Sequence, residues 1–169
     1  MSMKTRLRAT TENDLDFVLT AEQSPENSLF VTRWTREQHK AVFESRDGAH
    51  LIIETEPERR RVGYLILAGL ENANGSIELG RIVVTEKGKG HGRVALRLVK
   101  QLAFAESHAH RLWLDVKEHN QRARHLYESE GFIIEGALRE CLKTETGFES
   151  LVIMSILRHE YDQLAHASS

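Results

Sequence analysis

The sequence feature that most constrains the fold is the segment EKGKGHGR, at residues 86–93, in which glycine alternates with basic residues. A β-branched apolar run, 82–84, precedes it, and apolar residues at helical spacing follow it from Val94 to Leu102. The first N–H groups of a helix have no partner within the helix, and glycine lets the backbone curl closely around an anion. The segment therefore predicts a strand, a phosphate-binding turn and a helix, with an ordinary glycine-rich loop as the alternative.

Two common phosphate motifs do not fit this turn. The Walker pattern requires Ser or Thr after Gly-Lys, but here Gly92 is followed by Arg93 and Val94, which offer no hydroxyl to Mg²⁺. The dinucleotide fingerprint fails as well, because Arg93 stands where its third glycine is required. A site for a different phosphate compound is therefore predicted.

Apolar periodicity predicts strands and helices in the order β-α-α-β-β-β-α-β-α-β-β. We expect strands at 6–9, 50–54, 62–70, 76–84, 111–116, 132–135 and 149–156, and helices near 13–19, 35–43, 94–102 and 120–129. Thr35 with Gln38 fits a capping box at a helix start, and Gly131 fits a helix end. Because a β meander is combined with βαβ units, the predicted fold class is mixed α/β (α+β) with a mixed sheet.

Composition excludes several classes of protein. The 169 residues, 40% hydrophobic and 28% charged, predict one soluble domain over 1–169, with a core at about 5–158 and a short C-terminal tail. The net charge of −2 argues against a generally basic nucleic-acid binder. Cys141 is the single cysteine, so no intramolecular disulfide forms; we expect a buried or half-buried thiol and a cytoplasmic location. We expect no signal peptide, no membrane span and no metal site, since His108 and His110 lack nearby carboxylates.

A second motif lies in KEHNQRARHLYESEGF, residues 117–132. The pattern Asn-x-x-Ala-x-x-Leu-Tyr-x-x-x-Gly-Phe is filled at every place, by Asn120, Ala123, Leu126, Tyr127, Gly131 and Phe132. The glycine turn matches Gln/Arg-x-x-Gly-x-Gly/Ala, with Lys87 as a departure at the first place. With both motifs in this order, the chain resembles the GCN5-related N-acetyltransferases (GNAT) from roughly Leu7 to Leu157. The segment IIEGALRECL, 133–142, looks most like the branch with ribosomal-protein-alanine and polyamine acetyltransferases.

This resemblance implies a mostly antiparallel sheet flanked by helices, and acetyl-CoA as cosubstrate without a metal. It also implies that an amine attacks the thioester directly in a ternary complex. The pyrophosphate would lie on the turn, at Lys87, Gly88, Lys89, Gly90, His91, Gly92 and Arg93. The backbone of Ile82, Val83 and Val84 would pair with the pantetheine arm, and an N–H near Val83 would stabilise the oxyanion. Core packing is the alternative role of these three residues.

The resemblance also implies two catalytic residues. Tyr127 would assist the departing sulfur, although it could simply be a half-buried helix aromatic. Glu78 would act as the base, directly or through water, although it could be a solvated edge residue or a partner for Arg81. Strand alternation puts Glu78 and Ile82 on one face and Arg81 on the other, unless a bulge intervenes. Asn120 is expected to cap a helix and could contact the cofactor as well.

The acceptor remains open at this stage. The pocket would be built around Glu22, Asn27, Phe30 and Trp34, although aromatic side chains in such a segment are more often core than pocket. The acceptor is an amine-bearing small molecule or a protein N-terminus, and a non-catalytic acyl-CoA sensor is a further alternative. We expect no nucleic-acid or membrane partner, and the resemblance implies a possible homodimer.

Overall fold

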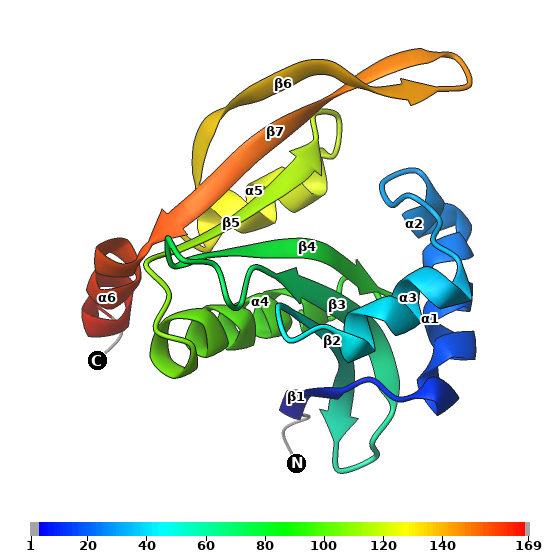
Figure 1. Ribbon diagram of the computed structural model, residues 1–169, viewed down its shortest axis with the longest axis horizontal. Helices are drawn as coiled ribbons and strands as arrows, with labels where there is room; N and C mark the ends of the chain where they lie inside the picture. Colours follow the sequence, from blue (N-terminus) through cyan, green and yellow to red (C-terminus); the bar gives the residue numbers. More distant parts are fainter. Residues whose placement is uncertain (1–3, 168–169) are drawn as a thin grey trace.

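The structure, a computed structural model, describes residues 4–167 and centres on a seven-stranded sheet (Figure 1). The strands are β1 (Lys4–Ala9), β2 (Gly48–Glu56), β3 (Arg61–Ala68), β4 (Ser76–Val84), β5 (Arg111–Lys117), β6 (Ile133–Thr144) and β7 (Gly147–Leu157). They lie in the order β1-β2-β3-β4-β5-β7-β6, and among them β4 and β5 form the parallel pair. The predicted mixed and mostly antiparallel sheet is confirmed.

The helices flank this sheet. They are α1 (Leu15–Gln23), α2 (Pro25–Ser28), α3 (Arg36–Glu44), α4 (His91–Gln101), α5 (Gln121–Ser129) and α6 (Arg158–Ala167), with short turns η1 (Glu12–Asp14) and η2 (Leu102–Glu106). The capping box that opens α3 is confirmed, since Thr35 and Gln38 bond reciprocally. Of the expected C-terminal tail, the part up to Ala167 belongs to the helix α6, whose Tyr161 stacks on Phe104 with ring centroids 4.9 Å apart; residues 168–169 lie outside the described residues.

Apolar side chains divide into two cores, one on each face of the sheet. The larger core contains Leu96, Val99 and Phe104 from α4 and η2, together with Ile77 and Leu79 of β4. The smaller core lies under α1 and α3; it is formed by Val18, Ala21, Ile52, Tyr64, Ile66 and Val83. Burial of these faces, rather than helix propensity, fixes α4 beneath the sheet and α1 and α3 at its other side.

The last two strands form a long hairpin that extends beyond the rest of the molecule (Figure 1). The sequence predicted both strands but made β6 much too short, because its outer residues are exposed and lack the apolar alternation that marks a half-buried strand. Cys141 lies on this hairpin and is exposed, so the expectation of a buried or half-buried thiol was wrong.

A bulge in β4 decides which side chains face the functional region. Ile66 pairs with Arg81 and Leu67 pairs with Leu79, so Gly80 is an extra residue in the strand. Beyond this bulge the alternation is shifted by one residue. Arg81 therefore shares a face with Glu78, and the expected face shared by Glu78 and Ile82 was wrong.

No helix within residues 4–167 is long and apolar enough to cross a membrane. Over the same residues, no three His, Cys, Asp or Glu side chains come together in a way that could hold a metal ion.

Candidate active site

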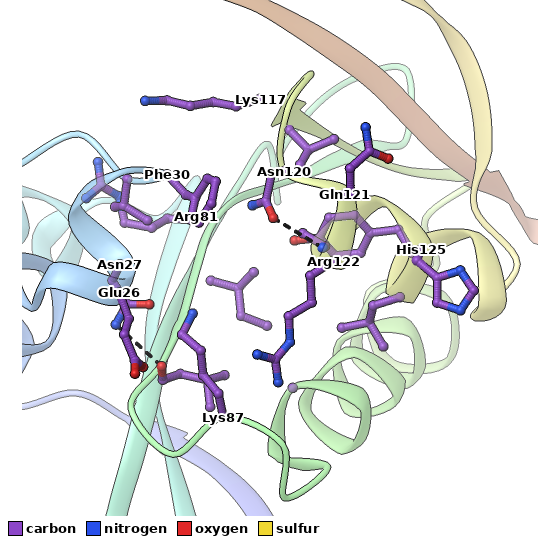
Figure 2. A pocket seen from close by; sticks show the side chains of 18 of the residues that line it. Glu26, Asn27, Phe30, Arg81, Lys87, Lys117, Asn120, Gln121, Arg122 and His125 are labelled. Atoms are coloured by element: carbon purple, nitrogen blue, oxygen red, sulfur yellow. Dashed lines mark hydrogen bonds between the residues drawn. The ribbon is translucent and has the colours of Figure 1, made fainter.

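A cleft of about 1120 Å³ opens where β4 and β5 separate. The two strands pair only over Ser76–Glu78 and Arg111–Trp113, and beyond this point they diverge. The cleft passes between them and is closed by the α2 region, the glycine turn and α5 (Figure 2). Of the residues predicted to bind the cofactor, those that line it are Ile82, Val84, Lys87, Gly88, Gly90, His91, Gly92, Arg93, Asn120 and Tyr127.

The glycine turn has the backbone geometry that an anion site requires. Gly88 and Gly90 have φ of 80° and 82°, in the left-handed region that favours glycine. Gly90 is the N-cap of α4, and its carbonyl accepts the first helical hydrogen bond, from Val94 at 3.1 Å. No acidic side chain lies in the first turn of α4 itself, so its free N–H groups are available to an anion; the nearby Glu86 lines the cleft, 3.7 Å from His91 Nε2. Lys89, also predicted for this site, lies outside the cleft lining and pairs with Glu86.

The edge of β4 that faces β5 is unpaired from Leu79 onward. Val83 pairs with Tyr64, and its carbonyl points towards β3. Because backbone direction alternates along a strand, the polar groups of Ile82 and Val84 point the other way, into the cleft. The side chain of Val83 is buried in the smaller core. Of the backbone N–H groups near Val83, that of Ile82 faces the cleft.

Tyr127 projects from α5 to the point where the strands diverge. It is 7% exposed, belongs to the larger core and lines the cleft. Its hydroxyl makes no hydrogen bond to the described part of the chain. Burial, and next the negative charge of Asp115, raise the pKa of Tyr127 well above its usual value, so the phenol stays protonated and its O–H is available as a donor. Asn120 caps α5 by accepting from the N–H of Ala123 at 3.2 Å, and it lines the cleft as well.

Two carboxylates stand on the opposite face of the sheet from Tyr127. Glu78 pairs in register with Trp113, and Asp115 follows two residues later on the same face. Asp115 lines the cleft, whereas Glu78, the predicted base, lies just outside the lining. Burial raises the pKa of both carboxyls, and the charge of Asp115 raises that of Glu78 further. Neither has an ion-pair or hydrogen-bond partner within residues 4–167. Sequence reasoning missed Asp115, although its place on a predicted strand just before Asn120 was a usable signal.

The wall opposite α5 comes from α2 and the loop after it. We call this the α2 wall; the residues that line the cleft from it are Glu26, Asn27, Phe30, Val31 and Thr32. Asn27 and Phe30 were predicted for the acceptor pocket and do line the cleft. Glu22 and Trp34 were predicted as well, but they lie behind the wall, and the side chain of Glu22 is wholly buried.

Residues 4–133 match the family described as "Acetyltransferase (GNAT) domain". The chain belongs to the GNAT acetyltransferase family. It is an acetyl-CoA-dependent N-acetyltransferase that transfers an acetyl group to a primary amine, as predicted from the two motifs.

Relatives of this acetyltransferase span nearly its whole length. Spermidine N(1)-acetyltransferase of Escherichia coli is 26% identical over 165 residues, which cover 92% of this chain and 87% of the relative. The enzyme of the same name from Vibrio cholerae is 27% identical over 171 residues, covering 95% and 97%. The crystal structure of spermidine N-acetyltransferase from Vibrio cholerae in complex with CoA and spermine has the same fold, with a TM-score of 0.84 at 22% identity over 93% of this chain and 97% of that one.

In this GNAT enzyme the end of the cleft between the glycine turn and α5, which we call the donor half, is lined by two cations that form no ion pair within residues 4–167. Figure 2 shows Lys87 from the glycine turn and Arg122 from α5 extending into the same space. Partial burial, and next the charge of Arg122, lower the pKa of Lys87. Arg122 lies close to Gly88 and has no carboxylate partner within residues 4–167. Two cations facing each other over free helix N–H groups fit the phosphates of CoA. Sequence reasoning missed Arg122, because the second motif leaves its position unspecified.

Proposed function

We propose that this enzyme acetylates a small polyamine. The observation that carries the proposal is the carboxylate pair of Glu78, which is half-buried, and Asp115, which is exposed to the cleft; within residues 4–167 neither forms an ion pair with a cation. Two carboxylates brought together without a counter-ion favour a cationic ligand. The names of the spermidine acetyltransferase relatives support the same class of acceptor.

The end of the cleft lined by Phe30 to Thr32, Arg81, Asp115 and Lys117 is called the acceptor half. The other charged side chains there do not repel a polycation. Two cations line it, Arg81 and Lys117, but each is neutralised by a carboxylate. Arg81 Nη1 lies 3.0 Å from Glu22, and Lys117 Nζ lies 3.1 Å from Glu149. Glu26 also lines the cleft, but it lies close enough to Lys87 for its charge to act on that lysine, so it is not counted in the acceptor half. The acceptor half of the cleft is therefore left with negative charge, while the donor half keeps Lys87 and Arg122.

The proposed roles follow from these positions. Acetyl-CoA supplies the acetyl group as an activated thioester. An alkyl ammonium with a pKa near 10.4 is neutral in only about one molecule in a few thousand at pH 7, so it must lose a proton before it attacks. Asp115 accepts this proton, directly or through water, with Glu78 behind it. The N–H of Ile82 is available to the carbonyl oxygen, and Tyr127 donates a hydrogen bond to the sulfur as the C–S bond breaks and the new C–N bond forms.

The proposal is tested by acetyl-CoA-dependent thiol release against polyamines, amino acids, aminoglycosides and peptides with free N-termini. We expect turnover with polyamines, at a rate that rises into pH 9 because more amine is neutral. Turnover confined to peptides, with little gain above pH 8, would indicate a protein α-amine with a pKa near 7.8 instead. CoA binding without any turnover would indicate a sensor.

Asp115→Asn should raise KM for the polyamine by about tenfold or more, because a hydrogen bond to a charged group contributes roughly 1.5–3 kcal/mol. KM for acetyl-CoA should not change. Because the pKa of Asp115 is raised, protonation removes its charge as the pH falls towards that pKa. The wild-type KM for the acceptor should therefore rise on acidification, and the variant should show a flatter profile. Glu118→Gln, an exposed carboxylate outside this cleft, is the control; an equal effect there would refute the local role of Asp115.

Arg122→Ala should raise KM for acetyl-CoA about tenfold to a hundredfold, since a charge-assisted hydrogen bond to phosphate is lost. The acceptor KM should stay unchanged. Lys89→Ala is the matched control, because it removes a cation from the same turn that does not line the cleft. Equal losses in the two variants, measured by initial rates over a range of acetyl-CoA, would mean that general basicity and not a direct contact matters.

The expected absence of a metal, the homodimer and the cytoplasmic location stay predictions.

A further inference from the structure

A fully buried carboxylate, Glu22, lies behind the α2 wall and is used by none of the steps above. Its Oε2 accepts from the hydroxyl of Tyr64 at 2.8 Å, from Arg81 Nη1 at 3.0 Å and from His39 Nε2 at 3.1 Å. Its Oε1 accepts from the N–H of Trp34 at 3.1 Å. Burial raises the pKa of Glu22, but hydrogen bonds from His39 and Tyr64 outweigh this and leave the pKa lowered. Glu22 is therefore ionised at neutral pH.

The network continues away from the cleft through two histidines. His39 Nδ1 lies 3.0 Å from His50 Nε2, and His50 Nδ1 lies 2.8 Å from the hydroxyl of Thr10. Burial, as the largest cause, lowers the pKa of His50 to about 4, so this ring is neutral. With His39 donating to Glu22, one consistent arrangement has Thr10 donating to His50 and His50 donating to His39. Each ring nitrogen of the two histidines then has a hydrogen-bond partner.

Among the described members of this network, Arg81 is the one that lines the cleft. The guanidinium of Arg81 donates to the carbonyl of Thr32 at 2.6 Å and lies over the ring of Trp34, with Cζ 4.5 Å from the centroid. An arginine does not give up its proton in proteins, so this hydrogen-bonded network cannot carry a proton out of the cleft through Arg81. Instead, the network fixes the backbone on both sides of residue 33. Arg81 donates to the carbonyl of Thr32, and Glu22 accepts from the N–H of Trp34.

We propose that Glu22 is a positioning residue that acts through Arg81 to fix the α2 wall, and thereby sets the affinity for the acceptor but not for acetyl-CoA. Without its carboxylate, Arg81 loses its counter-ion and Trp34 loses its N–H acceptor. The segment that carries Phe30 to Thr32 is then free to move away from the acceptor half of the cleft. Within residues 4–167, no hydrogen bond or ion pair joins this network to the glycine turn or to α5. The proposal rests on the proposed function in placing the acceptor against this wall.

The test compares Glu22→Gln, Arg81→Gln and the double variant. Each single change should raise the acceptor KM about tenfold or more, as expected for loss of a charged hydrogen-bond partner. The double variant should be no worse than the more severe single one, because both break the same connection. The Kd of CoA by calorimetry should not change. Arg81→Lys, which keeps the charge, should restore part of the affinity. If Glu22→Gln does not fold, Arg81→Gln decides alone.

His50→Gln is the matched control, because it disturbs the same buried network without touching the wall. An acceptor KM raised as much by His50→Gln as by Glu22→Gln, or a CoA Kd raised in parallel, would overturn the proposal. A second readout needs no turnover and so separates this proposal from the proposed function. The chain has two tryptophans, and in a Trp113→Phe background Trp34 reports on the wall alone. Acrylamide quenching of Trp34 fluorescence should increase in the Arg81→Gln variant. Unchanged quenching would show that Arg81 does not fix the α2 wall, even if no amine is turned over.

Discussion

Replacing Tyr127 with phenylalanine should lower kcat by at least about a hundredfold, within the range for a positioned proton donor, and leave the Kd of CoA nearly unchanged. The hydroxyl lines the cleft and has no hydrogen-bond partner within residues 4–167, so its removal breaks no contact that supports the fold. A departing thiolate has a pKa near 8.5, well below that of a buried phenol, so full proton transfer to sulfur is uphill. A hydrogen bond to the developing charge is the larger contribution. Initial rates with calorimetry on the same protein separate the two quantities.

Tyr161→Phe provides the matched control for this change. Tyr161 lies on α6 and stacks on Phe104, away from the cleft. Because the pKa of Tyr127 is raised, the wild-type rate should not fall through phenol ionisation between pH 7 and 9. If Tyr127→Phe kept the wild-type kcat while Tyr161→Phe did the same, Tyr127 would be a core residue only.

Local patterns were enough to predict most elements of the fold. The glycine turn, the Asn120 cap and the Gly131 helix end each follow from backbone chemistry that needs no partner elsewhere in the chain. Figure 1 shows why the mixed sheet could be predicted too, since the meander β2-β3-β4 and the crossover from β4 to β5 follow from element order. The length of β6 could not be predicted, because the side chains of its outer half are exposed and the sequence there lacks the alternation of apolar and polar residues that indicates a strand.

The acceptor half of the site was harder to predict, for a physical reason. The bulge at Gly80 shifts the alternation of β4, and only a structure shows it. With the shift, Arg81 turns towards Glu22. Glu78, which precedes the bulge, lies outside the cleft lining, whereas Asp115 is part of it. Arg122 was missed because its role depends on where α5 docks. Most residues predicted for the donor half line the cleft, because they belong to one local turn, whereas the position of the acceptor residues depends on long-range contacts.

The second large effect is expected at Glu130, which joins α4 to the end of α5. Its carboxylate accepts from Arg93 at 2.7 Å, from Arg97 at 3.1 Å and from Lys100 at 3.1 Å, and its carbonyl accepts from Lys100 at 2.7 Å. The side chains of Glu130 and Lys100 are only 5% and 7% exposed. Glu130→Gln leaves the buried ammonium of Lys100 without its counter-charge. We expect a loss of about 3–5 kcal/mol in the free energy of unfolding, measured by urea denaturation at pH 7.

The pH dependence of this loss distinguishes a charge effect from a packing effect. Burial raises the pKa of Glu130, but hydrogen bonds from Arg97, Arg93 and Lys100 outweigh it, and the pKa is lowered. A lowered folded-state pKa means that the stabilisation is complete above the unfolded value, near 4.3, and is lost as the pH falls through the folded value. The gap between wild type and Glu130→Gln should therefore narrow in acid. Lys100→Met, which leaves Glu130 with two arginines, should cost less and should recover part of the loss when combined with Glu130→Gln. A gap that is independent of pH, with strictly additive variants, would show that Glu130 contributes shape and not charge.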